Sequence, residues 1–228
     1  LVNQGYLNAR VTSQFQSLGH RRAKLVYNVN AGRLFIVDDI RTVVGNSDFE
    51  KILDDNRQSS LLVTGMQLNS QLLDQERTRI VELAHRNGYY DFNKDHVSFI
   101  ADTLAGSDRV GLTMMIDGQG TGHVYTVSKV NYLLSSGADR VEALIDEANR
   151  LDFDGYSIYW PKNEKELVLR PGVIASHSYM RQGQVYNTDT ISASYQSLSR
   201  LGLLKYSNIS LQRDPDFRDG IIANVSMM

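Results

Sequence analysis

The fold of this chain is decided by residues 69–130, which read NSQLLDQERTRIVELAHRNGYYDFNKDHVSFIADTLAGSDRVGLTMMIDGQGTGHVYTVSKV. Apolar residues such as Ile80 and Leu83 recur at steps of three and four, as on one face of a helix, and the pattern stops at Asn87 and Gly88. Two strand-like runs follow at residues 96–101 and 110–116, with a loop containing Gly106 between them. A helix, a glycine, an aromatic pair and a hairpin therefore follow one another, and residues 124–133 begin a new strand.

The same order of patterns occurs twice more. Gly5 precedes strand patterns at residues 11–16 and 23–30, and Gly202 precedes strand patterns at residues 207–213 and 220–226. Gly5, Gly88 and Gly202 are 83 and 114 positions apart. Recurrence at such a period indicates repeated compact modules, and a chance recurrence of hairpins is the alternative.

The middle repeat has every part of such a module. Residues 33–44 form a strand pattern, a short helix is expected around Phe49 and Leu53, and Asn69 or Ser70 is placed to cap the main helix. The order is thus strand, helix, helix, strand, strand. We predict an α+β fold of tandem small β-α-α-β-β modules, with residues 1–33 as the C-terminal part of a truncated first module, 34–120 as a second module and 121–228 as a third.

The third module differs from the second by an insertion near residues 138–165. Helical spacing predicts a helix at residues 138–150, and residues 156–160 read as a short strand ended by Pro161. The two helices of the module itself are expected at residues 169–179 and from Asn187 onward.

Composition excludes several classes of protein. The 228 residues carry a formal charge of −2, and the lysines and arginines are dispersed, which does not indicate a nucleic-acid surface. No cysteine is present, so disulfides, thiolate catalysis and cysteine metal sites are excluded. No apolar run is long enough for a spanning helix. Because Leu1 is neither an initiator methionine nor the start of a signal-like segment, we expect an excised piece of a longer protein.

No pattern of catalytic or ligand-binding residues stands out. The glycines at 118, 120 and 122 lack the G-x-G-x-x-G spacing and have strand patterns on both sides, so we predict a flexible connector. The five histidines are isolated in sequence, and Asp38 and Asp39 would point to opposite faces of a strand. We therefore predict no catalytic, cofactor-binding or metal-binding residue, and no enzyme.

Aromatic residues follow each of the helix-ending glycines. We predict that they pack under the preceding helix and anchor the hairpin, and a ligand platform is the alternative. Gly88 is expected at positive φ as a helix C-cap, where alanine would cost about 1 kcal/mol or more. The aromatic residues are Tyr6, Tyr89, Tyr90, Phe92 and Tyr206.

Two segments of the sequence resemble the polypeptide-transport-associated (POTRA) domain. The first is residues 86–90 (RNGYY) with Phe92 and residues 97–99 (VSF), and the second is Tyr186 with residues 198–206 (LSRLGLLKY). The sequence is most similar to BamA/TamA-type outer-membrane proteins of Bacteroidota-like bacteria at Tyr90, Phe92, Phe99, residues 102–103 and residues 125–127. The resemblance covers nearly the whole chain and depends on repetition of weak motifs in order. The incomplete first unit and the insertion in the third depart from the family pattern.

The resemblance implies a three-stranded mixed sheet under two helices in each module. It also implies periplasmic modules that lie before a C-terminal membrane β-barrel, which inserts or translocates other outer-membrane proteins without a nucleotide or cofactor. Partners would be unfolded outer-membrane protein clients, periplasmic assembly factors or both, and no nucleic acid.

The implied mode of binding is addition of an extended polypeptide to the second strand of each hairpin module. Those edges are expected at residues 11–16, 97–101 and 209–213, with Val11, Ser13, Phe15, Val97, Phe99, Ala101, Ile209 and Leu211 as site residues. The alternative is a structural scaffold or spacer that docks one fixed companion protein without contacting clients.

Overall fold

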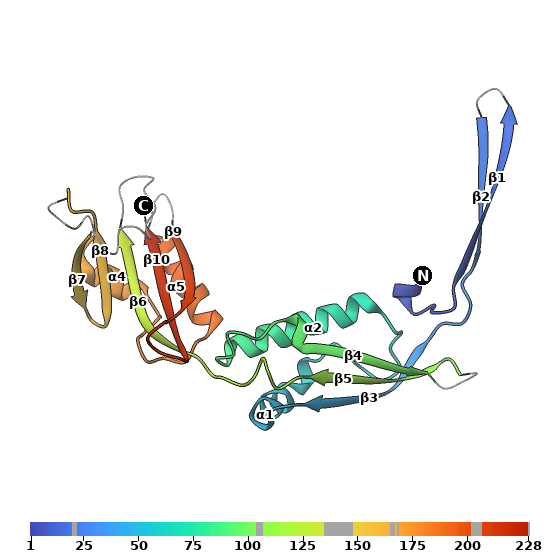
Figure 1. Cartoon of the computed structure of the whole chain (residues 1–228), viewed down its shortest axis with the longest axis horizontal. Coiled ribbons are helices and arrows are strands. Elements are labelled where there is room, and N and C mark those ends of the chain that lie inside the picture. The colour runs from blue at the N-terminus through green and yellow to red at the C-terminus, as the bar shows by residue number, and fades with distance from the viewer. Residues whose placement is uncertain are drawn as a thin grey trace. The chain divides into compact units, whose positions relative to one another are not determined.

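The computed structural model describes residues 1–19, 22–103, 107–134, 148–164, 167, 169–201 and 207–227 (Figure 1). The chain divides into two compact units. The first comprises Leu1–Val81 and Asn93–Gly120, and the second comprises Glu82–Phe92 and Thr121–Met228. The last turn of the main helix and the turn after it are thus part of the second unit. The division into three modules stays a prediction.

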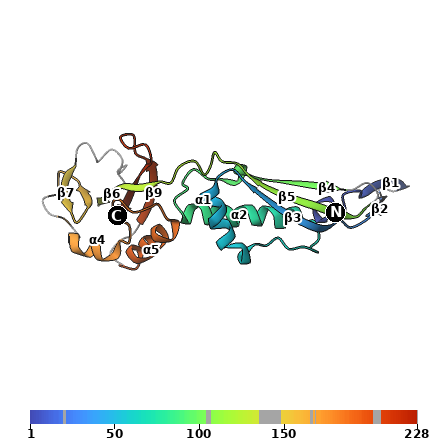
Figure 2. The same ribbon diagram turned by 90° about the horizontal axis from the view of Figure 1, so that it is seen from below.

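The first unit has the predicted order of strand, helix, helix, strand, strand. Its three strands form a mixed sheet in the order β3-β5-β4, in which β3 is parallel and β4 antiparallel to β5. Two helices cover one face of this sheet (Figure 2). The fold class is therefore confirmed. The elements are β3 (Ile36–Val44), α1 (Ser47–Asp55), η2 (Arg57–Ser59), α2 (Ser70–Arg86), η3 (Lys94–His96), β4 (Val97–Thr103) and β5 (Arg109–Ile116).

Helix caps and an alternating apolar face explain these elements. The Asn46 side chain accepts hydrogen bonds from the backbone N–H groups of Asp48 and Phe49, so Asn46 is the N-cap of α1. Asn69 caps α2 in the same way and accepts from the N–H of Gln71 at 2.9 Å. Burial of each large apolar side chain contributes about 1.5–3 kcal/mol. The buried face of β5 and the helix residues of the core are Val110, Leu112, Met114, Ile116, Phe49, Leu53 and Ile80.

A buried carboxylate connects α2 to the segment before it. Glu76 is 0% exposed and accepts hydrogen bonds from Ser60 Oγ and from the N–H of Leu61, both at 2.9 Å. Arg79 donates to it through Nε and Nη2, at 2.9 and 2.7 Å. Burial raises the pKa of Glu76, but the hydrogen bonds from Arg79 and Leu61, the charge of Arg79 and the Ser60 bond together lower it below its usual value.

The glycine-rich connector has a packing role that its sequence did not indicate. A Cβ atom added to Gly45 would lie 2.5 Å from the backbone nitrogen of Gly118, so these two glycines let the ends of β3 and β5 approach. Asp117 also accepts hydrogen bonds from the N–H groups of Gln119 and Gly120. The prediction of a merely flexible connector therefore missed these contacts.

The N-terminal hairpin is a separate two-stranded sheet within the first unit. Strands β1 (Arg10–Gly19) and β2 (Arg22–Asn30) pair antiparallel. They run further than the predicted 11–16 and 23–30, because Ser17 pairs with Ala23 and Gly19 with Arg22. Every residue of β1 is exposed, and Val26 is the one residue of β2 that is partly buried. A two-stranded hairpin of this kind is marginally stable on its own.

The second unit has a larger sheet than predicted. Its strands lie in the order β7-β8-β6-β10-β9, because the insertion adds β7 and β8 to the expected three strands. Two helices again cover one face (Figure 2). The elements are β6 (Thr126–Leu134), β7 (Asn149–Phe153), β8 (Tyr156–Trp160), α4 (Pro171–His177), α5 (Thr188–Ser199), β9 (Ser207–Arg213) and β10 (Gly220–Met227).

Part of the insertion was predicted wrongly. The helix expected at 138–150 is wrong at its C-terminal end, because Asn149 and Arg150 belong to β7. Residues 138–147 of that predicted helix lie outside the described part of the chain. The strand predicted at 156–160 is confirmed as β8. Asn187 caps α5 by accepting from Asp189 and Thr190.

Both units begin their first strand with the same arrangement around a glycine. In the first unit the N–H of Phe35 donates to the carbonyl of Gly5 at 2.9 Å, and in the second the N–H of Tyr125 donates to that of Gly88 at 2.8 Å. Gly5 and Gly88 have φ values of 85° and 93°. In each unit the residue before the second helix's N-cap then donates to the carbonyl of the residue just before the first strand, Leu68 to Phe35 and Tyr186 to Tyr125.

The aromatic residues after Gly88 divide between two roles. Tyr89 and Phe92 are buried, in accord with the predicted packing. Tyr90 instead lies with two tyrosines of the second unit, its ring centroid 5.7 Å from that of Tyr125 and 5.2 Å from that of Tyr186. Tyr206 lies outside the described residues.

Replacing Gly88 by alanine should destabilise the second unit by about 2–4 kcal/mol, because strain at positive φ adds to crowding. The new Cβ would lie 2.6 Å from Val124 Cγ1 and 2.9 Å from Val185 Cγ1. The measurement is denaturant unfolding followed by fluorescence of Trp160, the one tryptophan of the chain. Gly155→Ala is the control, since Gly155 has φ 80° and nothing within 4 Å of an added Cβ. Equal losses for the two variants would contradict the crowding argument.

Glu76→Gln should lower the free energy of unfolding of the first unit by about 2 kcal/mol at neutral pH. Because the folded-state pKa is lowered, the carboxylate stabilises the fold above its unfolded pKa of about 4.3, and this stability is lost as pH falls through the folded-state pKa. The variant should therefore lose less stability on acidification. Amide exchange of residues 60–80 at several pH values measures the free energy of unfolding at neutral pH and its loss on acidification. Asp48→Asn, in an exposed pair with Lys51, is the control that should leave them unchanged. If Glu76→Gln loses as much stability on acidification as the unchanged chain, the ionised Glu76 carboxylate is not the cause of the acid dependence.

Candidate functional site

The edge strand β4 presents backbone groups that no strand of its sheet pairs. The N–H of Asp117 donates to the carbonyl of His96, which fixes the phase of the antiparallel ladder between β4 and β5. Hydrogen-bonded positions alternate along such a ladder. Ser98, Ile100 and Asp102 therefore bond to β5. The backbone groups of the remaining residues point away from β5, and the N–H of Val97 donates to the Lys94 carbonyl. These residues are Val97, Phe99, Ala101 and Thr103.

The structure therefore brings the predicted residues of the middle edge onto one side of one strand. Val97 is buried, Phe99 is half-buried and Ala101 is exposed. Among the described residues, one side chain bonds to an outward group of this strand: Arg77 of α2, whose Nε donates to the Val97 carbonyl at 2.9 Å. The open part of the edge thus begins at Phe99.

The edge of the second unit is more closed than predicted. The phase of the β9–β10 ladder, set by the N–H of Asp214 donating to the carbonyl of Gly220, turns the backbone of Ile209 and Leu211 outward. The Tyr90 hydroxyl donates to the Leu211 carbonyl at 3.4 Å. Ile209 therefore keeps its outward backbone groups, whereas Leu211 has one that is already bonded.

An ion pair next to Tyr90 holds the end of β9. Arg213 Nη2 lies 2.5 Å from Asp91 Oδ1, and the Tyr125 hydroxyl donates to the other carboxylate oxygen. Burial and this hydrogen bond raise the pKa of Tyr125 to about 12. Burial raises the pKa of Asp91, but the bonds from Tyr125 and Arg213 outweigh it, so that the carboxylate stays ionised. These hydrogen bonds join Asp91 to Tyr125, just before β6, and to Arg213 at the end of β9.

The predicted residues of the first edge lie on one face of the N-terminal hairpin. The register pairs Val11 with Val29, Ser13 with Tyr27 and Phe15 with Leu25. Successive side chains of a strand alternate between faces, so these six share the apolar face of the hairpin. Val11 is 56% and Phe15 is 73% exposed. This apolar face has no cover in the described part of its unit.

Sequence reasoning missed a second edge in the first unit. β3 is also an edge strand, and its start is paired with residues 65–68 through bonds such as Val37 N–H to the Met66 carbonyl, at 2.9 Å. Further along lies a cavity of about 610 Å³ between β3, α1 and Arg79. Acidic and basic side chains line it together, including Asp39, Glu50, Asp54 and Arg57. A predicted sheet order with β5 in the centre would have shown that both outer strands have free edges.

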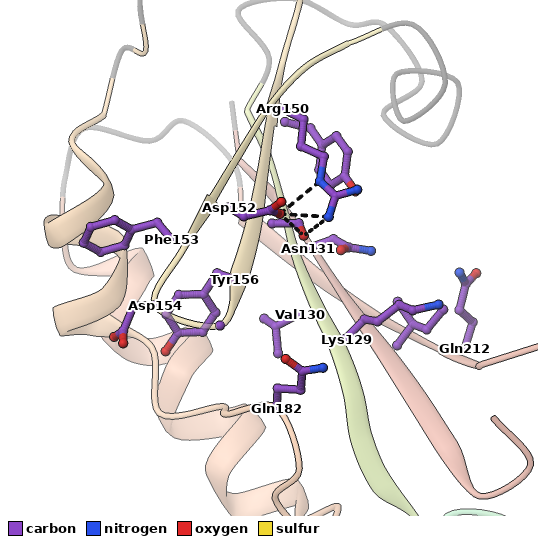
Figure 3. A pocket seen from close by; sticks show the side chains of 14 residues that line it. Lys129, Val130, Asn131, Arg150, Asp152, Phe153, Asp154, Tyr156, Gln182 and Gln212 are labelled. Carbon is purple, nitrogen blue, oxygen red and sulfur yellow. Dashed lines mark hydrogen bonds and ion pairs between the residues drawn. The ribbon is translucent and has the colours of Figure 1, made fainter. Parts of the chain in front are cut away.

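The insertion forms a second cavity, of about 720 Å³, in the second unit (Figure 3). It lies where β6 and β8 diverge, because their parallel pairing is confined to residues 131–133 of β6. Asp152 Oδ1 is 2.9 Å from Arg150 and accepts from Ser157 Oγ at 2.8 Å. The Ser157 and Arg150 hydrogen bonds hold the pKa of Asp152 below its usual value. These charged groups satisfy one another, which does not favour a catalytic role.

Two of the described histidines each lie beside a different aspartate. His96 lies 2.9 Å from Asp117 and His123 lies 3.2 Å from Asp219. Within the described ranges, no group of three or more His, Asp or Glu side chains is placed to hold a metal ion. His20 lies outside those ranges. No helix among the described residues has both the length and the apolar composition needed to cross a membrane.

Comparison with known proteins identifies the fold and not a close relative. No protein-family model matches the sequence, and no curated protein matches it. The structure of POTRA3–5 of BamA from Haemophilus influenzae aligns with a TM-score of 0.54 and 13% identity, covering 99% of this chain and 74% of that one.

A second similar structure is BamA from Haemophilus ducreyi lacking POTRA domains 1–3. It aligns with a TM-score of 0.57 and 13% identity over 85% of this chain. The aligned part spans 29% of that BamA chain. Identities this low establish a shared fold, and they confirm the resemblance of the β-α-α-β-β modules seen in the sequence. The chain therefore has the fold of the POTRA domains of BamA.

Proposed function

We propose that these modules bind extended polypeptide segments by β-strand addition, as the periplasmic part of an outer-membrane β-barrel protein that inserts or translocates other outer-membrane proteins. The observation that carries this proposal is the outward backbone of Phe99 and Ala101 on β4, which has no partner among the described residues. Unpaired N–H and C=O groups along an edge are a template for another strand.

The flanking side chains suit a partner of varied sequence. The exposed residues beside the open groups include the apolar Ile100 and the polar Ser98, and Ile100 is 53% exposed. Backbone hydrogen bonds supply affinity that does not depend on the partner's side chains, whereas a few apolar contacts favour segments with alternating apolar residues. Clients of this chemistry are unfolded strands of outer-membrane proteins, which alternate in this way.

The other predicted edges enter the proposal with different weights. Ile209 keeps outward groups on β9, and Tyr90 reduces what Leu211 can offer. Val11, Ser13 and Phe15 stay a prediction, because their hairpin presents a whole apolar face as well as a free edge. The β4 edge is therefore the site on which the proposal depends.

Ala101→Pro should weaken binding of an unfolded outer-membrane protein by about tenfold, the equivalent of one lost hydrogen bond. Proline removes the N–H that points to the open edge and leaves the ladder to β5 intact, because edge strands tolerate proline at such a position. Ala101→Thr keeps the N–H and is the matched control. Binding is measured by titration of the 1–228 chain with the client diluted from denaturant, after circular dichroism has shown that both variants are folded.

Photo-crosslinking from Ser98 and Ala101 in cells separates this proposal from the scaffold alternative. Adducts with a range of newly made outer-membrane proteins support client binding. Adducts with a single fixed companion would show that the modules act as a docking scaffold. Unchanged affinity of the proline variant would remove the β4 edge from the mechanism altogether.

A further inference from the structure

Arg77 covers the first outward carbonyl of the β4 edge. It lies on α2, and its Nε donates to the Val97 carbonyl at 2.9 Å. The guanidinium carbon lies 5.2 Å from the centroid of the Phe99 ring. The same side chain therefore contacts two successive residues whose backbone faces the edge, Val97 by a hydrogen bond and Phe99 by stacking.

The hydrogen bond from Arg77 is hard to displace by an incoming strand. A bond from a charged donor is about twice as strong as one from a neutral N–H. The stacking on Phe99 adds a cation–π attraction and holds the planar guanidinium in place. An added strand would offer the Val97 carbonyl only a neutral amide. Arg77 should consequently keep that carbonyl while the rest of the edge pairs.

The second unit shows a related arrangement on its own edge strand. There the Tyr90 hydroxyl donates to the outward carbonyl of Leu211. In both units a side chain from outside the sheet thus closes one outward carbonyl of the edge strand and leaves others open. The position closed differs, at the start of β4 and near the end of β9.

We propose that Arg77 sets the register of the polypeptide strand that adds to β4. The Val97 N–H already donates to the Lys94 carbonyl, and Arg77 keeps the Val97 carbonyl. Pairing is thereby limited to Phe99, Ala101 and Thr103, so that one alignment of the added strand is favoured. This inference rests on the strand addition proposed above. Without such a limit an edge with few side-chain pockets specifies register weakly, because backbone bonds are nearly the same in every alignment.

Lys94 provides a matched control for charge. It lies just before β4 and pairs with Asp74 of α2 at 2.9 Å. Its ammonium contributes a positive charge near the start of β4, but its hydrogen bond goes to a carboxylate and not to the edge. Loss of Lys94 should therefore change the local charge without opening the Val97 carbonyl.

The test is disulfide mapping in the full 1–228 chain, which has no cysteine of its own. A single cysteine replaces Ala101, and the probes are synthetic peptides of about ten alternating apolar and polar residues, each with one cysteine at a different position. The yield of each disulfide is measured in three backgrounds: unchanged, Arg77→Met and Lys94→Met. Methionine keeps the aliphatic packing on Phe99 and removes the donor.

The unchanged chain and Lys94→Met should each give one dominant cysteine position, and in Arg77→Met its share should fall by about threefold as positions two residues away gain. An unchanged distribution in Arg77→Met would overturn the role of Arg77 and leave strand addition standing. Yields that do not depend on peptide position in any background would overturn both. Circular dichroism of the three chains checks that each is folded.

Discussion

The alternation of hydrogen bonds along an antiparallel ladder is the constraint on which the proposed function of this structure depends. Each residue of β4 directs its N–H and C=O to the same side, so half of the strand must face away from β5. Val97, Phe99 and Ala101 lie on that side. The N–H of Val97 donates to the Lys94 carbonyl, and Arg77 donates to the Val97 carbonyl. Solvent or another strand has to satisfy the outward groups of Phe99 and Ala101. The edge is consequently a liability for aggregation and, in the proposed function, a binding surface.

The same constraint is met differently at the other outer strands. β3 is covered at its start by residues 65–68, and β6 by residues 183–184 in the corresponding way. In the second unit the inserted strand β8 also pairs with β6, and β7 becomes the outer strand. Coverage of the first strand of each module leaves β4 and β9, the first strands of the two hairpins, as the more accessible edges. Gly5 and Gly88, both at positive φ, accept the bonds from Phe35 and Tyr125 that lead into these strands.

Much of this fold could be predicted because it follows from local patterns. The alternation in residues 110–116, the helical spacing around Ile80 and the stop at Gly88 each specify an element without reference to distant residues. Repetition of those elements then indicated the modules, and the family resemblance implied the edge at Val97, Phe99 and Ala101. The phase of the ladder also follows from pattern, since the apolar face of β4 and the register of β5 fix each other.

What could not be predicted depends on contacts between distant residues. Arg77 and Val97 are 20 positions apart, and Tyr90 and Leu211 are 121 apart, so no local pattern connects either side chain with the carbonyl that it closes. The approach of Gly45 to Gly118 is of the same kind. Residues 149–150 were assigned to a helix because apolar spacing in the preceding residues outweighed a strand only five residues long. Short strands that join a sheet at its edge leave little signal in sequence.

Amide hydrogen exchange along β4 tests the central claim most directly. The exchange rates of four consecutive amides, from Ser98 to Ala101, are compared with and without an alternating peptide of about ten residues. If strand addition occurs at this edge, the amides of Phe99 and Ala101 gain protection, and those of Ser98 and Ile100 change little because they already bond to β5. Equal changes at all four amides, or none at Phe99 and Ala101, would contradict the account.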